Sequence, residues 1–158
     1  MVLSNELKIA IVVNLIIFMI FSYGGATYEH LAYFFDQSRG KVLTNAIVTG
    51  FSIYGLGAFA MVGADKLLKP KNLLWRFLLY TAVGTGIEYA GGLIVGAGPS
   101  DPTKPVQSWD YSHIPFNYKG IISLKHAVVW GLSGFVVVAV YDHTNKFLTC
   151  AFQENCHK

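Results

Sequence analysis

The sequence predicts an all-α, polytopic membrane protein: a four-helix transmembrane bundle with a re-entrant or lid-like loop between the third and fourth helices. Three observations predict this fold. Hydrophobic residues make up 53% of the 158 residues and charged residues only 13%, against about 25% charged in soluble domains. Four stretches have the length, roughly 20 apolar residues, that a bilayer crossing requires. Because unpaired backbone groups are costly in lipid, these stretches should be helices.

The four expected spans belong to a single transmembrane domain, 1–158, and cover about residues 9–30, 42–64, 75–97 and 121–141. We expect the first to be retained rather than cleaved as a signal peptide, because only Lys8 precedes it and Glu6 offsets that charge. The second carries no charge. The third holds Glu88 well inside, and the fourth carries Lys125 and His126 near its start. Glycines in the middle spans indicate close helix packing.

The most basic connection lies between the second and third spans and contains Lys66, Lys69, Lys71 and Arg76. Because positive loops stay in the cytoplasm, we place this loop and both termini there, in a plasma membrane. The polar residues of the helices then converge on the outer half of the bundle, below the loop WDYSHIPFNYKG (Trp109 to Gly120).

This convergence predicts a polar, acidic site. The acid–base or catalytic candidates are Glu29, Glu88, Asp110 and His126, because ionisable groups inside a membrane are commonly functional. We expect Asp110 to point inward, toward the two glutamates. The expected substrate-binding residues are Tyr54, Trp109, Tyr111, Asn117, Lys125 and Trp130.

Each candidate also has a purely structural interpretation. Glu88 would form an ion pair with Lys125, and Glu29 would lie in water at the membrane boundary. His126 would be a hydrogen-bonded packing residue. Asp110 would cap its own loop, as aspartates in turns often do. The loop aromatics would form an interfacial belt.

Several classes of site are absent from the sequence. The net charge is +3 with scattered basic residues, so nucleic acid is not an expected partner. No nucleophile-elbow, zinc-protease or phosphate-loop motif occurs. Cys150 and Cys156 make a poor zinc site, and no disulfide is expected in a cytoplasmic tail. The sequence therefore specifies no cofactor and leaves metal binding open.

Four stretches, in order, resemble the Putative ABC-transporter type IV (CmpB-like) family of small four-helix membrane proteins, over roughly residues 19–135. They are YGGATYEHLAY, which contains Gly25 and Glu29; SIYGLGA, with Ser52 in place of the family's proline; GIEYAGG, which contains Glu88; and WDYSHIPFNYKGIISLKHAVVWGLSG. The resemblance implies a four-helix membrane fold and supports the acidic site.

Three functions remain open. A transporter- or permease-like component for a small solute or ion would use Glu88 to bind a cation or proton, with a second copy or a partner membrane subunit to complete the pathway. An intramembrane enzyme would act on a lipid or amphiphile by carboxylate and histidine acid–base chemistry or with a metal. A scaffold would use the acids to set helix register. The lipid bilayer is a partner in all three.

Overall fold

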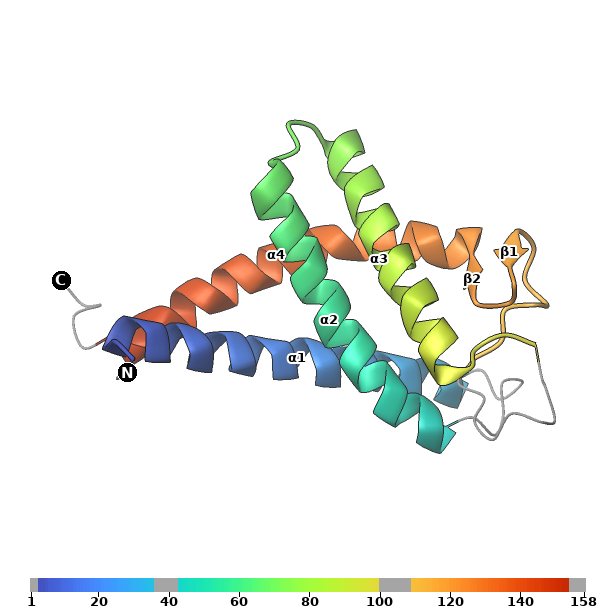
Figure 1. Ribbon diagram of the computed structural model, residues 1–158, viewed down its shortest axis with the longest axis horizontal. Coiled ribbons are helices and arrows are strands. Elements are labelled where there is room, and N and C mark those ends of the chain that lie inside the picture. The colour runs from blue at the N-terminus through green and yellow to red at the C-terminus, as the bar shows by residue number, and fades with distance from the viewer. Residues whose placement is uncertain (1–2, 36–42, 100–108, 154–158) are drawn as a thin grey trace.

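The computed structural model describes residues 3–35, 43–99 and 109–153. Within them lie four long helices and one short hairpin (Figure 1). The elements are α1 (Asn5–Phe35), α2 (Leu43–Leu68), α3 (Leu73–Val95), β1 (Asn117–Tyr118), β2 (Ile122–Ser123) and α4 (Leu124–Phe152). The prediction of an all-α chain is confirmed at this level. The two strands pair antiparallel, Asn117 with Ser123 and Tyr118 with Ile122.

Polar caps and left-handed residues define the helix ends. Asn72 caps α3, its side chain accepting a hydrogen bond from the backbone N–H of Trp75 at 2.9 Å. Gly96 ends α3 in the left-handed region, at φ 70°, where glycine has no Cβ penalty. Lys69 ends α2 with φ 45°, and Pro70, which cannot continue a helix, follows it. These signals produce a tight turn between α2 and α3.

The helix α1 packs mainly against α2, and α3 packs mainly against α4, while α2 and α3 also contact each other. The α2–α3 pair crosses α1 and α4 obliquely, and α1 and α4 meet near the two chain ends (Figure 1). Where the helices meet, Val13 and Ile17 of α1, Val62 of α2 and Tyr141 of α4 form a buried cluster. Many large apolar side chains point outward instead, including Leu15, 60% exposed, and Ile94, 85% exposed. An apolar exterior of this kind suits lipid rather than water.

Among the described residues, three helical segments are long and apolar enough to cross a membrane: Asn5–Tyr28, Leu73–Val95 and Leu124–Phe152. The second predicted span falls in α2, whose side chains at 43–52 lie outside the described residues.

The fourth helix differs most from its predicted bounds of 121–141. It begins only at Leu124, because Ile122 and Ser123 belong to the hairpin and Ser123 caps the helix. It then continues to Phe152. Its last turns keep an apolar contact, since Leu148 packs against the buried cluster.

Cys150, near the end of α4, is disulfide-bonded. The expectation that the cysteines of this tail stay reduced was therefore wrong. Cys156, the other cysteine of the chain, lies outside the described residues.

Candidate functional site

Glu88 occupies the inward face of α3. The buried residues of this helix are Tyr80, Gly84, Glu88 and Gly92, each four residues from the next, which places them on one stripe of the helix. Glu88 is only 6% exposed. It precedes the end of the helix at Val95 by seven residues, about 10 Å along the axis. The Glu88 carboxylate thus lies along a helix that is long enough to cross a membrane, and not at the end of that helix.

Two donors from other parts of the chain bind the two oxygens of this carboxylate. The hydroxyl of Tyr111, in the loop before α4, donates to Glu88 Oε1 at 3.0 Å. The indole Nε1 of Trp130, on α4, donates to Glu88 Oε2 at 3.1 Å. The glutamate therefore ties α3 both to the loop and to α4.

A glycine allows Trp130 to come this close. A Cβ added at Gly84 would lie 2.7 Å from Cβ of Trp130 and 2.6 Å from Cε of Met61, closer than real Cβ atoms approach. On its other side the Trp130 ring lies near Tyr54 of α2, with centroids 5.9 Å apart. The helices α2, α3 and α4 thus meet around this indole.

Tyr111 connects Glu88 to a histidine. Its ring stacks on the His126 imidazole, with centroids 4.0 Å apart and planes 6° from parallel. Nδ1 of His126 lies 2.8 Å from the Ser123 hydroxyl oxygen, and Ser123 is buried. Together Glu88, Tyr111, Trp130, His126 and Ser123 make up what we call the Glu88 cluster. These groups can accept, donate and exchange protons.

Hydrogen bonds within the loop around Tyr111 hold that tyrosine in place. The N–H of Tyr111 donates to the carbonyl of Gly120 at 2.8 Å. The indole of Trp109 donates to the carbonyl of Ile121 at 2.8 Å. The Asn117 side-chain amide donates to the carbonyl of Ile114 at 2.8 Å, and its oxygen accepts from the N–H of Gly120 at 3.1 Å.

The predicted site residues therefore separate into groups. Glu88, Tyr111, Trp130 and His126 meet in the cluster, and Tyr54 borders it. Trp109 and Asn117 hold the loop together instead. Lys125 is exposed, and Tyr111 and Trp130 are two neutral donors to Glu88. The side chain of Glu29 lies outside the described residues.

Asp110 has a local role in the structure. Its Oδ1 accepts a hydrogen bond from the N–H of Ser112 at 2.8 Å, the pattern of an Asx turn. The same oxygen sits against Gly120, 2.8 Å from where a Cβ there would be. This hydrogen bond matches the structural interpretation, in which Asp110 caps its own loop.

Sequence reasoning missed two features. Ser123 belongs to the cluster, and its place just before an apolar helix was a detectable N-cap signal. The second is a buried acid, Asp65, at the other end of α2 and α3. Asp65 Oδ1 accepts from the Tyr80 hydroxyl at 2.6 Å and lies 3.4 Å from Arg76 Nε. Asp65 directly follows the second predicted span, 42–64, so the apolar pattern gave no sign that it would be buried.

The part of the chain that the structure describes contains no ready-made metal-binding site. No three His, Cys, Asp or Glu side chains lie there close enough to hold an ion. The cluster that is described consists of one carboxylate, one imidazole and neutral hydrogen-bond donors.

Comparison with known proteins identifies a family. The model of the family described as Putative ABC-transporter type IV matches residues 16–156. This match includes every residue of the Glu88 cluster. No solved structure gives a significant match to the chain.

Proposed function

The chain belongs to the Putative ABC-transporter type IV family, and from this premise we propose that it moves a small solute or ion across the membrane by means of a proton held on Glu88. The family and the three apolar helices indicate an integral membrane protein with a transporter-like role. The proton, the gate and the orientation described below are the parts that we propose.

The burial of Glu88 between apolar helices is the observation that carries this proposal. A charge inside a membrane is expensive, and residues that bear one usually mark an ion or proton pathway. Glu88 is buried, and both of its oxygens accept hydrogen bonds from neutral donors. Such a group can exchange a proton without breaking an ion pair to either donor.

The loop at 109–120 supplies a gate in this proposal. Its backbone and side-chain hydrogen bonds make it a single unit, and Tyr111 links that unit to Glu88. Movement of the loop would break this link and admit water or solute to the carboxylate. Non-helical backbone near membrane depth is tolerated where it lines such a cavity. In this proposal the segment serves as the lid-like or re-entrant loop expected from the sequence.

The proposed topology has four spans, which are the three apolar segments of α1, α3 and α4 together with α2. The basic turn between α2 and α3 faces the cytoplasm together with both termini, and the Glu88 cluster lies in the outer half of a plasma membrane. The disulfide at Cys150 is the observation that speaks for the opposite orientation, because disulfides persist mainly in oxidising compartments. Four helices leave little room for alternating access, so we propose a second copy or a partner subunit.

Proton flux into liposomes tests this function. Purified protein is reconstituted around a pH-sensitive dye, and a potassium diffusion potential drives protons inward. We expect flux above that of empty liposomes, a loss of at least tenfold in Glu88→Gln, and a reduced flux in Tyr111→Phe. Tyr118→Phe is the matched control, because this loop tyrosine is 55% exposed and should leave flux unchanged. Equal flux in wild-type and Glu88→Gln liposomes would refute the proposal.

One contact favours a second candidate, an intramembrane enzyme acting on a lipid or amphiphile. The Ser123 hydroxyl lies 2.8 Å from His126 Nδ1, a distance at which an imidazole can activate a hydroxyl nucleophile. The competing explanation is helix capping, because the same oxygen accepts from the backbone N–H of His126 at 3.3 Å. Labelling with a fluorophosphonate separates the two: an enzyme would be labelled at Ser123 and lose the label in His126→Ala, while a capping serine would stay unlabelled.

A further inference from the structure

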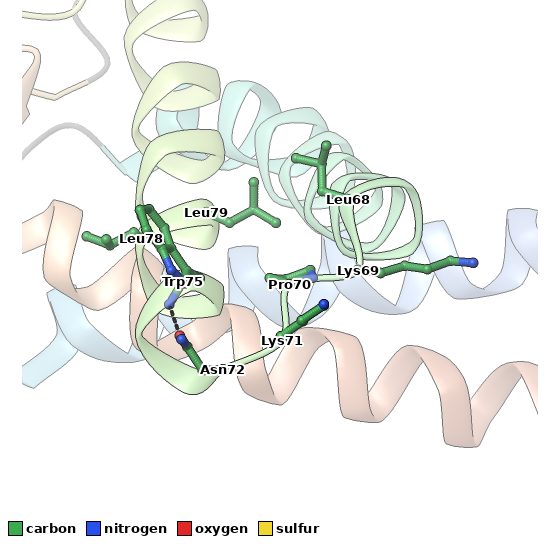
Figure 2. Close-up of a pocket in the computed structure, with 8 residues that line it drawn as sticks. All are labelled: Leu68, Lys69, Pro70, Lys71, Asn72, Trp75, Leu78 and Leu79. Carbon is green, nitrogen blue, oxygen red and sulfur yellow. Dashed lines mark hydrogen bonds between the residues drawn. The ribbon is translucent and has the colours of Figure 1, made fainter.

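A groove lies at the turn between α2 and α3, away from the Glu88 cluster. It has a volume of about 630 Å³ and lies between the last residue of α2, Leu68, and the first turns of α3 (Figure 2). Leu78 and Leu79 form its α3 side together with Trp75, and Pro70 lies at the turn. The groove is mostly apolar, yet it opens at a helix end, where a membrane protein meets headgroups.

The apolar residues that line the groove are exposed. Leu68 is 68% exposed, Trp75 62% and Leu78 43%. Side chains of this size are normally covered, by protein or by lipid. Tryptophan in particular is enriched where hydrocarbon gives way to headgroups. The lining therefore suits an acyl chain with its glycerol end at the level of the indole.

The charges around the turn decide which headgroup fits. Of its four cations, Lys66 lies 3.4 Å from Asp142 and Arg76 lies 3.4 Å from Asp65. Lys69 and Lys71 have no carboxylate partner among the described residues. Both lysines line the groove, and Figure 2 shows them flanking Pro70 at the turn, with Lys69 extended away from α3. Two positive charges thus remain for an external anion at the mouth of an apolar groove.

We propose that this groove binds one anionic phospholipid, with its phosphate at Lys71 and an acyl chain along Leu68, Trp75 and Leu78. Lys69 adds long-range attraction from the rim. A soluble phosphate would meet the same lysines but would leave the apolar lining uncovered, so lipid is the occupant that satisfies both parts. The proposal does not depend on the role of Glu88.

Lipid binding to the detergent-purified full chain is the test. Affinities for phosphatidylglycerol and phosphatidylcholine are measured with fluorescent analogues, in the wild type and in Lys71→Gln, Leu78→Asn and Lys146→Gln. Lys146 is the matched control, because it is an exposed lysine outside the groove. Glycerol phosphate is added as a soluble competitor.

We expect the wild type to prefer phosphatidylglycerol, and Lys71→Gln to weaken that lipid about fivefold. The same change should weaken phosphatidylcholine less, because its choline cation already offsets the phosphate charge. Leu78→Asn should weaken both lipids, and Lys146→Gln neither. Three results would overturn the proposal: equal affinity for the two lipids in the wild type, an equal loss in Lys146→Gln, or competition by glycerol phosphate as strong as that by the lipid. Size-exclusion profiles identify a variant that has lost its fold, and Lys69→Gln, with a smaller expected loss, then replaces Lys71→Gln.

Discussion

At the scale of the residue, Tyr111 is the side chain through which the loop and the buried carboxylate act on each other. Its hydroxyl binds Glu88 and its ring lies on His126. The two contacts use different parts of the side chain, so they can be removed separately. Removing one partner of a buried hydrogen bond leaves the other partner unsatisfied, which costs about 1–3 kcal/mol of stability.

Tyr111→Phe should therefore destabilise the protein by about 1–3 kcal/mol, because it removes the donor to Glu88 and keeps the ring on His126. Tyr118→Phe, in the same loop and 55% exposed, should change stability by less than about 0.5 kcal/mol. Unfolding by sodium dodecyl sulfate in mixed micelles, followed by tryptophan fluorescence, measures both. A cost in Tyr118→Phe as large as that in Tyr111→Phe would show that the hydrogen bond to Glu88 contributes nothing.

At the scale of the element, two of the glycines of α3 differ in their surroundings. Gly84 faces inward, where an added Cβ would meet Trp130 and Met61, whereas Gly86 has nothing within 4 Å of such an atom. The close contact of α3 with α4 thus depends on a missing side chain at one position of the helix. In a membrane, where helices do not associate by the hydrophobic effect, such close packing is a main source of association.

Gly84→Ala should cost about 1–3 kcal/mol, because the new methyl group forces Trp130 or the helices apart. Gly86→Ala should be neutral or should stabilise α3 by up to about 1 kcal/mol through helix propensity. Thermal unfolding of the two variants in the same detergent gives the comparison. Because a displaced Trp130 would also leave Glu88, we expect Gly84→Ala to lower proton flux. A fully stable Gly84→Ala would mean that α3 and α4 pack less closely there.

At the scale of the whole molecule, the polar groups form two separate centres. The Glu88 cluster lies at the loop end of α3, and Asp65 with Tyr80 and Arg76 lies toward its other end. The basic α2–α3 turn extends the second centre. In a bilayer, these centres face opposite leaflets if α3 crosses it, so the orientation of the chain decides which side has access to Glu88.

Cysteine labelling in intact cells determines that orientation. In a background with Cys150→Ser and Cys156→Ser, we expect a membrane-impermeant maleimide to label Ser112→Cys directly. Lys71→Cys should be labelled only after permeabilisation, because positive turns stay in the cytoplasm. Both positions are exposed, so access depends on the membrane alone. The reverse pattern would place the Glu88 cluster on the cytoplasmic side and would agree with the disulfide at Cys150.

The sequence alone predicted most of the helical framework, because apolar runs and end signals act locally. The runs predicted four helices, and capping rules account for the ends of α3 at Asn72 and Gly96. The same signals predicted the helix bounds less accurately where the chain leaves the apolar run. The helix α4 begins three residues later than predicted, after a hairpin, and α2 extends past Ala64 to include Asp65. Glu88 could be identified from the sequence because an acidic residue within an apolar helix is conspicuous whichever way the helix faces.

Which residues contact Glu88 could be decided only by the tertiary structure. Its donors, Tyr111 and Trp130, are 23 and 42 residues away in sequence. Which of the many nearby aromatic and polar residues reach it depends on how α3 and α4 are rotated against each other, and glycines such as Gly84 set their separation. The residue type of Asp110 suited both a site and a turn, and only the structure shows its hydrogen bond to the N–H of Ser112. The sequence specifies which groups are chemically able to act, and packing decides which of them come within hydrogen-bond distance of Glu88.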